Sequence, residues 1–389
     1  MVTCEVCNLK PSDASISKIE PPPKEPEEHQ EDPVPEMPEE ARTEIHGIMV
    51  QPKIDPTVPQ QLWKAGMWNI LHYLLLIYTY AGVLMNALIQ HKGMLPDPSG
   101  GDSCKIQNGP NGKLLSKVAL TTQEELDQVK PVKIFCGLYT MEKNKENIES
   151  SRSTWGKRCD GFLAFSTKTD ASIPSINIEH EGQESWDNMW QKSRSIWRYI
   201  GVHYLDDFDW FLLGGDDMFY IMENLRYYLG SEEIQLLQES RNGMFIGRRF
   251  FPPGQKVFNS GGAGYLLDKK SLIALLGNID TNPKCWIHQK GFWEDVNVAN
   301  CLRVSAGIEP YDTRDPLKRE RFHPFTPGQH LEYRPPKSGN DWYPKYNPEL
   351  MFGYDCCSDR SIAWHYAKAA VMINLHNFMY HCQSKPKLA

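Results

Sequence analysis

Two adjacent carboxylates, Asp216 and Asp217, follow an apolar run in the stretch WFLLGGDDMFY at 210–220. Neighbouring carboxylates repel each other unless a cation or a proton lies between them, and hard divalent ions prefer such oxygen ligands. Gly-Gly-Asp-Asp is also favourable turn chemistry, so an acidic turn without a ligand is the alternative. The pattern therefore has two interpretations, a divalent-cation site and a plain turn.

The elements around these carboxylates predict where they lie. The apolar run at 208–213 is typical of a parallel strand buried on both faces. Strand patterns at 132–140 and 160–167 precede it, helical patterns occupy 144–155 and 184–204 between the strands, and a further helix is expected at 221–229. This alternation predicts a parallel α/β sheet with right-handed crossovers, whose carboxyl edge is where such sheets bind ligands.

The predicted helix at 184–204 carries apolar residues at helical spacing. We interpret them as a core stripe that packs on the sheet, in preference to a binding role. The residues of this stripe are Trp186, Met189, Trp190, Ile196, Trp197 and Ile200.

The N-terminal 66 residues differ in composition from the rest of the chain. They are rich in Pro and Glu and carry 13 acidic and 6 basic side chains, whereas the remainder of the 389 residues carries 36 of each sign. Such a segment cannot bury enough apolar surface to offset its chain entropy, so 1–66 is predicted to be a disordered acidic tail. The neutral remainder argues against a nucleic-acid partner, because phosphate binding depends on clustered Lys and Arg.

The next segment, 67–89, contains no formally charged residue. As a helix it would be roughly 35 Å long, enough to cross a bilayer core of about 30 Å. It lies too far from the N-terminus for a cleaved signal peptide, so we predict an uncleaved transmembrane signal anchor, with a buried core helix as the alternative. Flanking lysines are nearly balanced and leave the orientation open. The turn-rich segment 90–130 is typical of a stem.

Eight of the ten cysteines follow this apolar segment. An even number permits disulfides if that part of the chain is secretory, and buried free thiols in a cytosolic enzyme are the alternative. No CxxC pair of the zinc-ribbon type occurs among these eight, so a structural zinc site is not expected there.

Six motifs follow one another between residues 132 and 381. They are KIFCGLYT with SSRSTWGKRCDGFLAFST, then DWFLLGGDDMFYIMENLRYYL, GRRFFPPGQKVFNSGGAGYLLDKKSL, WEDVNVANCL, RFHPFTPGQHL and DCCSD. Together they resemble the core 1 β1,3-galactosyltransferase group of glycosyltransferase family 31, which is related to the Fringe enzymes. One motif alone would be a weak signal, but six in the family's order are specific.

The resemblance implies a GT-A fold, an α/β structure with a Rossmann-like, mostly parallel sheet flanked by helices and preceded here by one transmembrane helix. It also implies a single-pass type II protein of the Golgi membrane. In that arrangement the tail 1–66 is cytosolic, 67–89 is the signal anchor, 90–130 is the stem and 131–389 is the lumenal catalytic domain.

The lumen is oxidising, so the resemblance makes disulfides expected. Connectivity cannot be deduced from sequence alone, and proximity in the chain suggests the partners. The suggested pairs are Cys136 with Cys159 and Cys285 with Cys301, while the adjacent Cys356 and Cys357 form a vicinal bridge or pair elsewhere.

The resemblance also implies a metal ion beside the donor. The family has three aspartates in a row where this chain has Gly215, Asp216 and Asp217. Asp217 corresponds to a metal ligand, as does His323 in FHPF, although a His before Pro is more often a packed or surface residue. The ion would be Mn²⁺, with Mg²⁺ as the alternative, because oxygen-rich sites suit both. Gly215 departs from the pattern and is expected to weaken the metal site or its contact with the ribose.

Donor, acceptor and base residues are carried over from the same motifs. Asp295 is the expected catalytic base for the acceptor hydroxyl, with Glu294 as its substitute, and the alternative is that both acids only start a helix. Glycines of NSGGAGY let the backbone approach the donor sugar, or they form a turn. The expected donor-binding residues are Thr140, Arg152, Asp216, Gly261 and Gly262, and the expected acceptor-binding residues are Trp342 and Tyr343.

The implied activity is inverting transfer of galactose from UDP-galactose, in β1,3 linkage, to N-acetylgalactosamine on Ser or Thr of glycoproteins. The alternatives are a related transferase with another donor or acceptor and a catalytically silent paralogue that assists folding. The retained carboxylates and His323 favour catalysis. A homodimer is compatible with the sequence, which does not specify the oligomeric state.

Overall fold

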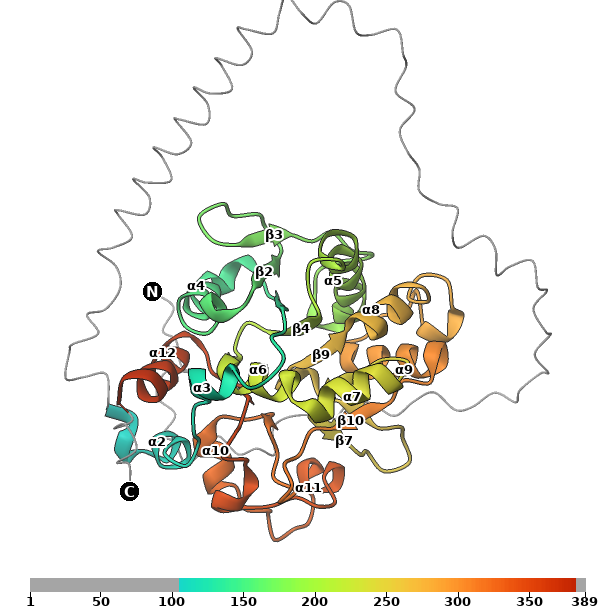
Figure 1. The fold of residues 1–389 in the computed structure, drawn as a ribbon. Helices are drawn as coiled ribbons and strands as arrows, with labels where there is room; N and C mark the ends of the chain where they lie inside the picture. The colour runs from blue at the N-terminus through green and yellow to red at the C-terminus, as the bar shows by residue number, and fades with distance from the viewer. Residues whose placement is uncertain (1–104, 383–389) are drawn as a thin grey trace, which may run out of the picture. The chain divides into compact units, whose positions relative to one another are not determined.

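The fold is built on one seven-stranded sheet. The computed structural model describes residues 105–382, drawn in colour in Figure 1. The strand order is β10-β6-β9-β4-β1-β2-β3, and β9 is antiparallel to both of its neighbours while the other pairs are parallel. Its strands are β1 (Ile134–Tyr139), β2 (Gly161–Ser166), β3 (Ser175–Asn177), β4 (Trp210–Gly215), β6 (Phe245–Gly247), β9 (Tyr265–Asp268) and β10 (Pro310–Asp312).

Helices cover both faces of this sheet (Figure 1). Because side chains alternate along a strand, β1 directs Ile134 and Leu138 into one core and Phe135 into the other. The first core includes side chains of α4, α6, α7 and α12, and the second includes side chains of α5, α8 and α9. The helices are α2 (Pro110–Leu115), α3 (Gln123–Leu126), α4 (Lys145–Ser153), α5 (Met189–Tyr204), α6 (Met222–Gly230), α7 (Glu232–Ser240), α8 (Lys269–Leu276), α9 (Glu294–Ala306), α10 (Pro327–Glu332), α11 (Trp342–Tyr346) and α12 (Ala369–Asn377).

The predicted alternation of strands and helices is confirmed by β1, α4, β2, α5 and β4. β1 pairs in parallel with both β2 and β4, so these strands end at one edge of the sheet. All six residues of β4 are buried, as its continuous apolar run predicted. Asp216 and Asp217 therefore follow directly on the carboxyl edge of a central strand.

One member of the predicted core stripe lies elsewhere. Trp186 belongs to a 3₁₀ turn, η7 (Trp186–Asn188), because α5 begins only at Met189. Trp186 is 66% exposed, whereas Trp190 and Trp197 within the helix are fully buried. The late helix start takes Trp186 out of the helical register, so its assignment to the core was wrong.

The predicted membrane anchor is not supported. The segment 67–89 and the tail 1–66 lie outside the described residues. Within 105–382, no helix combines the length and the apolar character needed to cross a bilayer. This finding corrects the expected fold class to a mixed α/β protein with a central, mostly parallel sheet, and it removes the structural basis for the expected single-pass Golgi membrane location.

Residues 105–130, expected as part of a stem, pack against the body of the protein. Leu114 and Leu115 of α2 are buried, and the Asn111 Oδ1 atom accepts a 2.6 Å hydrogen bond from the Gly328 N–H in α10. The backbone N–H and the hydroxyl of Thr121 both donate to one side-chain oxygen of α6 at 2.9 Å. These contacts join the segment to the same folded unit as the sheet.

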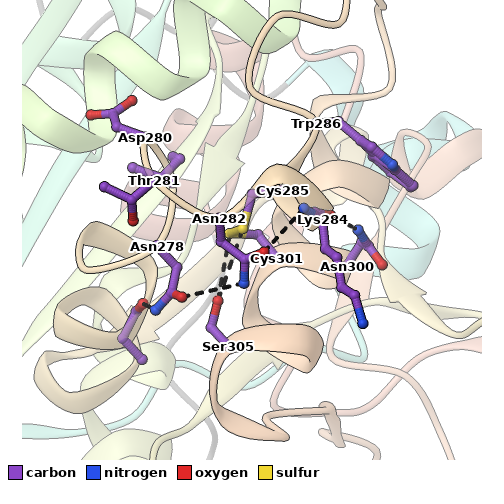
Figure 2. The surroundings of a disulfide bond; sticks show 12 residues. Asn278, Asp280, Thr281, Asn282, Lys284, Cys285, Trp286, Asn300, Cys301 and Ser305 are labelled. Atoms are coloured by element: carbon purple, nitrogen blue, oxygen red, sulfur yellow. Dashed lines mark hydrogen bonds between the residues drawn. A yellow bond between two sulfur atoms is a disulfide. The ribbon is translucent and has the colours of Figure 1, made fainter. Parts of the chain in front are cut away.

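Disulfides stabilise connections around the sheet. Figure 2 shows one that joins the turn η9 (Pro283–Cys285) to α9, beside a 2.7 Å hydrogen bond from the Asn300 amide to the Lys284 carbonyl. The predicted pairs are confirmed, and the open alternative is decided in favour of a vicinal bridge. The bonds are Cys136–Cys159, Cys285–Cys301 and Cys356–Cys357.

Replacing Cys285 and Cys301 together by Ala should lower the free energy of unfolding by about 3 kcal/mol, the scale for a loop of this length. The bridged cysteines are 16 residues apart, and opening the loop gives the unfolded chain more conformations. Chemical denaturation followed by circular dichroism measures the change. An unfolding midpoint equal to that of the unmodified protein would contradict a stabilising role.

Candidate active site

Two adjoining hollows lie at the carboxyl edge of the sheet. The polar hollow has a volume of about 420 Å³ and includes Thr140, Asp216 and Asp217 in its lining. The aromatic hollow has a volume of about 180 Å³ and is lined mostly by aromatic side chains, together with Glu294, Asp295 and His365. The residues that line both hollows, and so mark their junction, are Tyr139, Trp186 and Met189.

Asp216 is held by side chains that follow β1. Its Oδ2 atom accepts hydrogen bonds from the Thr140 hydroxyl and, at 2.8 Å, from the Asn144 amide. Its Oδ1 atom accepts a 3.0 Å bond from the Asn147 amide. Burial raises the pKa of Asp216, and these donors oppose the rise. The carboxylate thus fixes the segment 140–147 that forms one wall of the polar hollow.

Three lysines among the residues that line the polar hollow bring positive charge to it. Lys143 and Lys368 are exposed, whereas Lys192 is 2% exposed. The Lys192 ammonium donates to the Thr140 carbonyl at 2.6 Å and to a Glu184 oxygen at 2.9 Å. Burial lowers the pKa of Lys192, and the nearby carboxylate opposes the decrease. The same lining carries the carboxylates of Glu146, Glu184, Asp216 and Asp217, so this hollow combines lysines that suit an anionic ligand with oxygen ligands that suit a cation.

Asp217 faces His365 across a small second sheet. In this sheet β12 (Ala363–Trp364) lies between β11 (Phe322–His323) and β5 (Phe219–Tyr220). The Ala367 N–H donates to the Asp217 carbonyl at 2.8 Å, and the Asp217 Oδ1 atom lies 3.2 Å from the His365 Nε2 atom. Burial raises the pKa of Asp217, but His365 and other neighbours lower it by more, so the carboxyl group stays ionised.

The geometry of His365 fits a metal ligand. Its Nδ1 atom lies 3.3 Å from the Pro324 carbonyl, which can only accept, so the proton of the neutral ring is on Nδ1. Nε2 lies 3.2 Å from the Asp217 Oδ1 atom, where a proton on the ring makes an ion pair, and a divalent cation could take the place of that proton. A backbone carbonyl that orients the far nitrogen is also typical of metal-binding histidines. Asp217 and His365 therefore fit one oxygen and one nitrogen ligand of a divalent ion.

His323, the expected metal ligand, lies away from both hollows. It is fully buried, and its ring stacks on Trp364 with centroids 3.8 Å apart. Among the described residues, His323, His330 and Cys357 could each offer a ligand atom within 4.8 Å of the others, but Cys357 is in a disulfide and has no thiolate. Burial keeps the pKa of His323 far below its usual value. We interpret His323 as a core residue.

The acid pair Glu294 and Asp295 starts α9. The Asp295 Oδ2 atom accepts from the Gly261 N–H at 2.8 Å, and the Glu294 Oε2 atom accepts from the Tyr265 hydroxyl at 2.8 Å. Burial raises the pKa of Asp295 to about 6. Burial, followed by the charge of Asp295, raises the pKa of Glu294 to about 8. The pKa of Glu294 lies above that of Asp295, so Asp295 is the acid of the pair that ionises first as the pH rises.

The glycine loop brings the acid pair and His365 close together. A Cβ atom on Gly261 would lie 2.5 Å from the Glu294 Oε1 atom, and one on Gly262 would lie 3.0 Å from the His365 ring. A side chain at either position would require Glu294 or His365 to move. The backbone of this loop therefore lies between the candidate base and the candidate metal ligand.

Gly215, which departs from the family pattern, lies close to the side chains of Asp217 and Tyr139. A Cβ atom there would lie 3.1 Å from the Asp217 Oδ1 atom and 3.4 Å from the Tyr139 ring. An aspartate at 215 would add a negative charge beside Asp217 and crowd the aromatic ring. Glycine leaves room for Tyr139 at the junction of the hollows.

The remaining predicted residues divide between the hollows and other places. Trp342 lines the aromatic hollow, whereas Tyr343 is buried and its hydroxyl accepts a 3.2 Å bond from Arg248. Arg152 is exposed and donates to the Ser172 carbonyl at 3.2 Å, outside the polar hollow. The predicted residues that the hollows bring together are Thr140, Asp216, Asp217, Gly261, Gly262, Glu294, Asp295 and Trp342.

His365→Ala should weaken Mn²⁺ binding in the presence of UDP on the order of 100-fold while leaving the melting temperature nearly unchanged, because a half-buried ligand is lost. His323→Ala is the matched control. It should keep the Mn²⁺ affinity but destabilise the fold by about 3 kcal/mol, since it leaves a cavity in the core. Electron paramagnetic resonance of Mn²⁺ and thermal unfolding separate the two effects, and the reverse pattern would restore His323 as the ligand.

Comparisons with known proteins assign the chain to a family. No family model matches the chain. It is 32% identical over 267 residues to glycoprotein-N-acetylgalactosamine 3-beta-galactosyltransferase 1 of Xenopus laevis. The matched region covers 68% of this chain and 70% of the Xenopus protein. It is also 27% and 22% identical to chondroitin sulfate synthase 3 of Mus musculus and Homo sapiens, over 45% of this chain and 21% of each synthase. With the identity and coverage of the Xenopus relative, the chain belongs to the core 1 β1,3-galactosyltransferase family.

Proposed function

We propose that this protein is an inverting β1,3-galactosyltransferase that transfers galactose from UDP-galactose to N-acetylgalactosamine linked to Ser or Thr of glycoproteins. One observation carries the proposal: the ionised Asp295 and the Asp217–His365 pair lie on either side of the Gly261–Gly262 loop, at the junction of two hollows of different chemistry. Family membership supports the galactosyl donor and the acceptor, and the residues of the site support the reaction.

The polar hollow is the proposed donor site. Its lysines suit the diphosphate of UDP-galactose, and the wall fixed by Asp216 and Thr140 limits its shape. A divalent cation held by Asp217 and His365, Mn²⁺ or Mg²⁺, would supply positive charge beside the departing diphosphate. The low pKa of Asp217 keeps its carboxylate ready for such an ion at neutral pH.

Asp295 is the proposed base. It lines the aromatic hollow, where an acceptor hydroxyl can approach from the side opposite to the departing diphosphate, so one base is enough for inversion. The Gly261 N–H fixes the orientation of the Asp295 carboxylate. Glu294 holds its proton at neutral pH, so the pair does not accumulate two negative charges.

A catalytically silent folding partner is less well supported. That function would not need an ionised carboxylate with a raised pKa in a hollow large enough for a ligand, nor a histidine oriented toward a second carboxylate. The space taken by Tyr139 beside Gly215 gives the altered aspartate motif a steric explanation that does not involve loss of activity.

The direct test uses the full chain with Mn²⁺, UDP-galactose and a peptide that carries O-linked N-acetylgalactosamine. We expect UDP release that depends on the acceptor and a β1,3-linked product identified by NMR. Asp295→Asn should lower kcat by about 100-fold or more, because the amide cannot take the proton. Glu294→Gln, the matched control, should retain most activity because it imitates the protonated acid. Full activity of Asp295→Asn would contradict the assignment of the base.

The pH dependence follows from the raised pKa of Asp295. The base acts in its ionised form, so kcat/KM should rise with pH up to about 6 and then level off. Above about 8, Glu294 loses its proton and adds a charge beside Asp295, which should change the rate in the unmodified protein but not in Glu294→Gln. Initial rates from pH 5 to 9 measure both limbs. A rate independent of pH between 5 and 7 would exclude Asp295 as the base.

A further inference from the structure

The two hollows differ in their basic side chains. Three lysines line the polar hollow beside four carboxylates, but the described residues that line the aromatic hollow include no Lys or Arg. Its ionisable lining consists of Glu294, Asp295, His365 and tyrosines. An anionic group would meet the charge of Asp295, and the described residues of the lining offer no Lys or Arg to pair with it, so this hollow favours uncharged ligands.

An exposed aromatic pair stands at the entrance of this hollow. Trp186 is 66% exposed, lines both hollows and stacks on Phe292 with an angle of 15° between the ring planes and centroids 6.2 Å apart. Phe292 in turn packs edge-on against Trp293 at 4.8 Å. Trp186, Phe292 and Trp293 thus form a contiguous group of aromatic rings in the lining of this hollow, and contiguous apolar surface beside a groove marks a ligand-binding site more often than a single exposed residue does.

The loop that carries Phe292 is held firmly against α5. The Trp190 backbone N–H donates to the Gly291 carbonyl at 3.0 Å, and its indole N–H donates to the Trp286 carbonyl at 2.9 Å. The Gln191 amide donates to two further loop carbonyls at 2.9 Å. The disulfide in Figure 2 fixes the start of the same loop. The aromatic pair is thus preorganised by contacts on both of its sides.

We propose that Trp186 and Phe292 form a platform on which the apolar face of an uncharged acceptor sugar ring stacks, which makes Trp186 a determinant of acceptor specificity. The occupant is the hexosamine whose hydroxyl Asp295 deprotonates, so the inference rests on the proposed function and names residues that select its acceptor. A neutral ring avoids charge repulsion from the acid pair, and its C–H face gains contact with the exposed indole. A uronic acid ring lacks a partner for its carboxylate in this hollow.

The test compares variants of the full chain with UDP-galactose and an N-acetylgalactosaminyl peptide. Trp186→Ala should raise the acceptor KM by about tenfold, the scale of one aromatic contact, and leave the donor KM within about twofold. Trp186→Phe should recover most of the affinity, which a purely structural role would not require. Leu236→Ala on α7 is the control, because Leu236 is also exposed, at 57%, but does not line either hollow. An unchanged acceptor KM in Trp186→Ala would overturn the proposal.

An acceptor panel tests the charge argument. The unmodified protein should use a neutral N-acetylhexosaminide at least about tenfold better than a uronide of the same size, and equal use would overturn the proposal.

Failure of the proposed function is distinguishable from failure of the platform. If the unmodified protein transfers galactose to no acceptor, saturation-transfer NMR with methyl N-acetylgalactosaminide decides: binding that Trp186→Ala abolishes supports the platform, and binding that the variant retains contradicts it.

Discussion

The site depends on how four carboxylates share one poorly solvated end of the sheet. The negative charge of each carboxylate is offset in a different way. Hydroxyl and amide groups donate to Asp216, and the His365 imidazole pairs with Asp217. Backbone N–H groups donate to Asp295, and the raised pKa of Glu294 favours its protonated form. Tyr139 lines both hollows, and its pKa is raised by burial and then by the charges of Glu294, Asp217 and Asp295. If all four acids were ionised without these partners, mutual repulsion would open the site. Compensation instead leaves two charges available, one on each side of the glycine loop.

The fold supplies this arrangement from segments far apart in the chain. β4 brings Asp217 to the carboxyl edge, the small second sheet brings His365 beside it, and α9 presents the acid pair through its first turn. Gly261 and Gly262 approach the acid pair and His365 closely because they have no side chains to place there. The polar hollow thereby holds the lysines that suit a diphosphate, and the aromatic hollow holds the surface that suits a sugar. The two hollows share one boundary.

The sequence predicted the parts that depend on local patterns. Continuous apolar runs identified β1, β2 and β4, and the family motifs led to Asp217 and the acid pair, which line the two hollows. His365 was not among the predicted residues, because its approach to Asp217 depends on β12 pairing with β5, a contact between residues more than a hundred positions apart, whereas His323 was predicted from its motif alone. Trp186 was placed in the core because periodicity does not show where a helix starts. The antiparallel β9 and the exposure of Arg152 likewise follow from tertiary contacts that no local pattern encodes.

The most direct test of this account is a crystal structure with UDP and Mn²⁺, with the ion located by anomalous diffraction at the manganese edge. The account predicts one Mn²⁺ ion bound by a carboxylate oxygen of Asp217 and by the Nε2 atom of His365, with the diphosphate in the polar hollow and Asp295 across the glycine loop. An ion bound by His323, or a nucleotide bound outside the polar hollow, would contradict it.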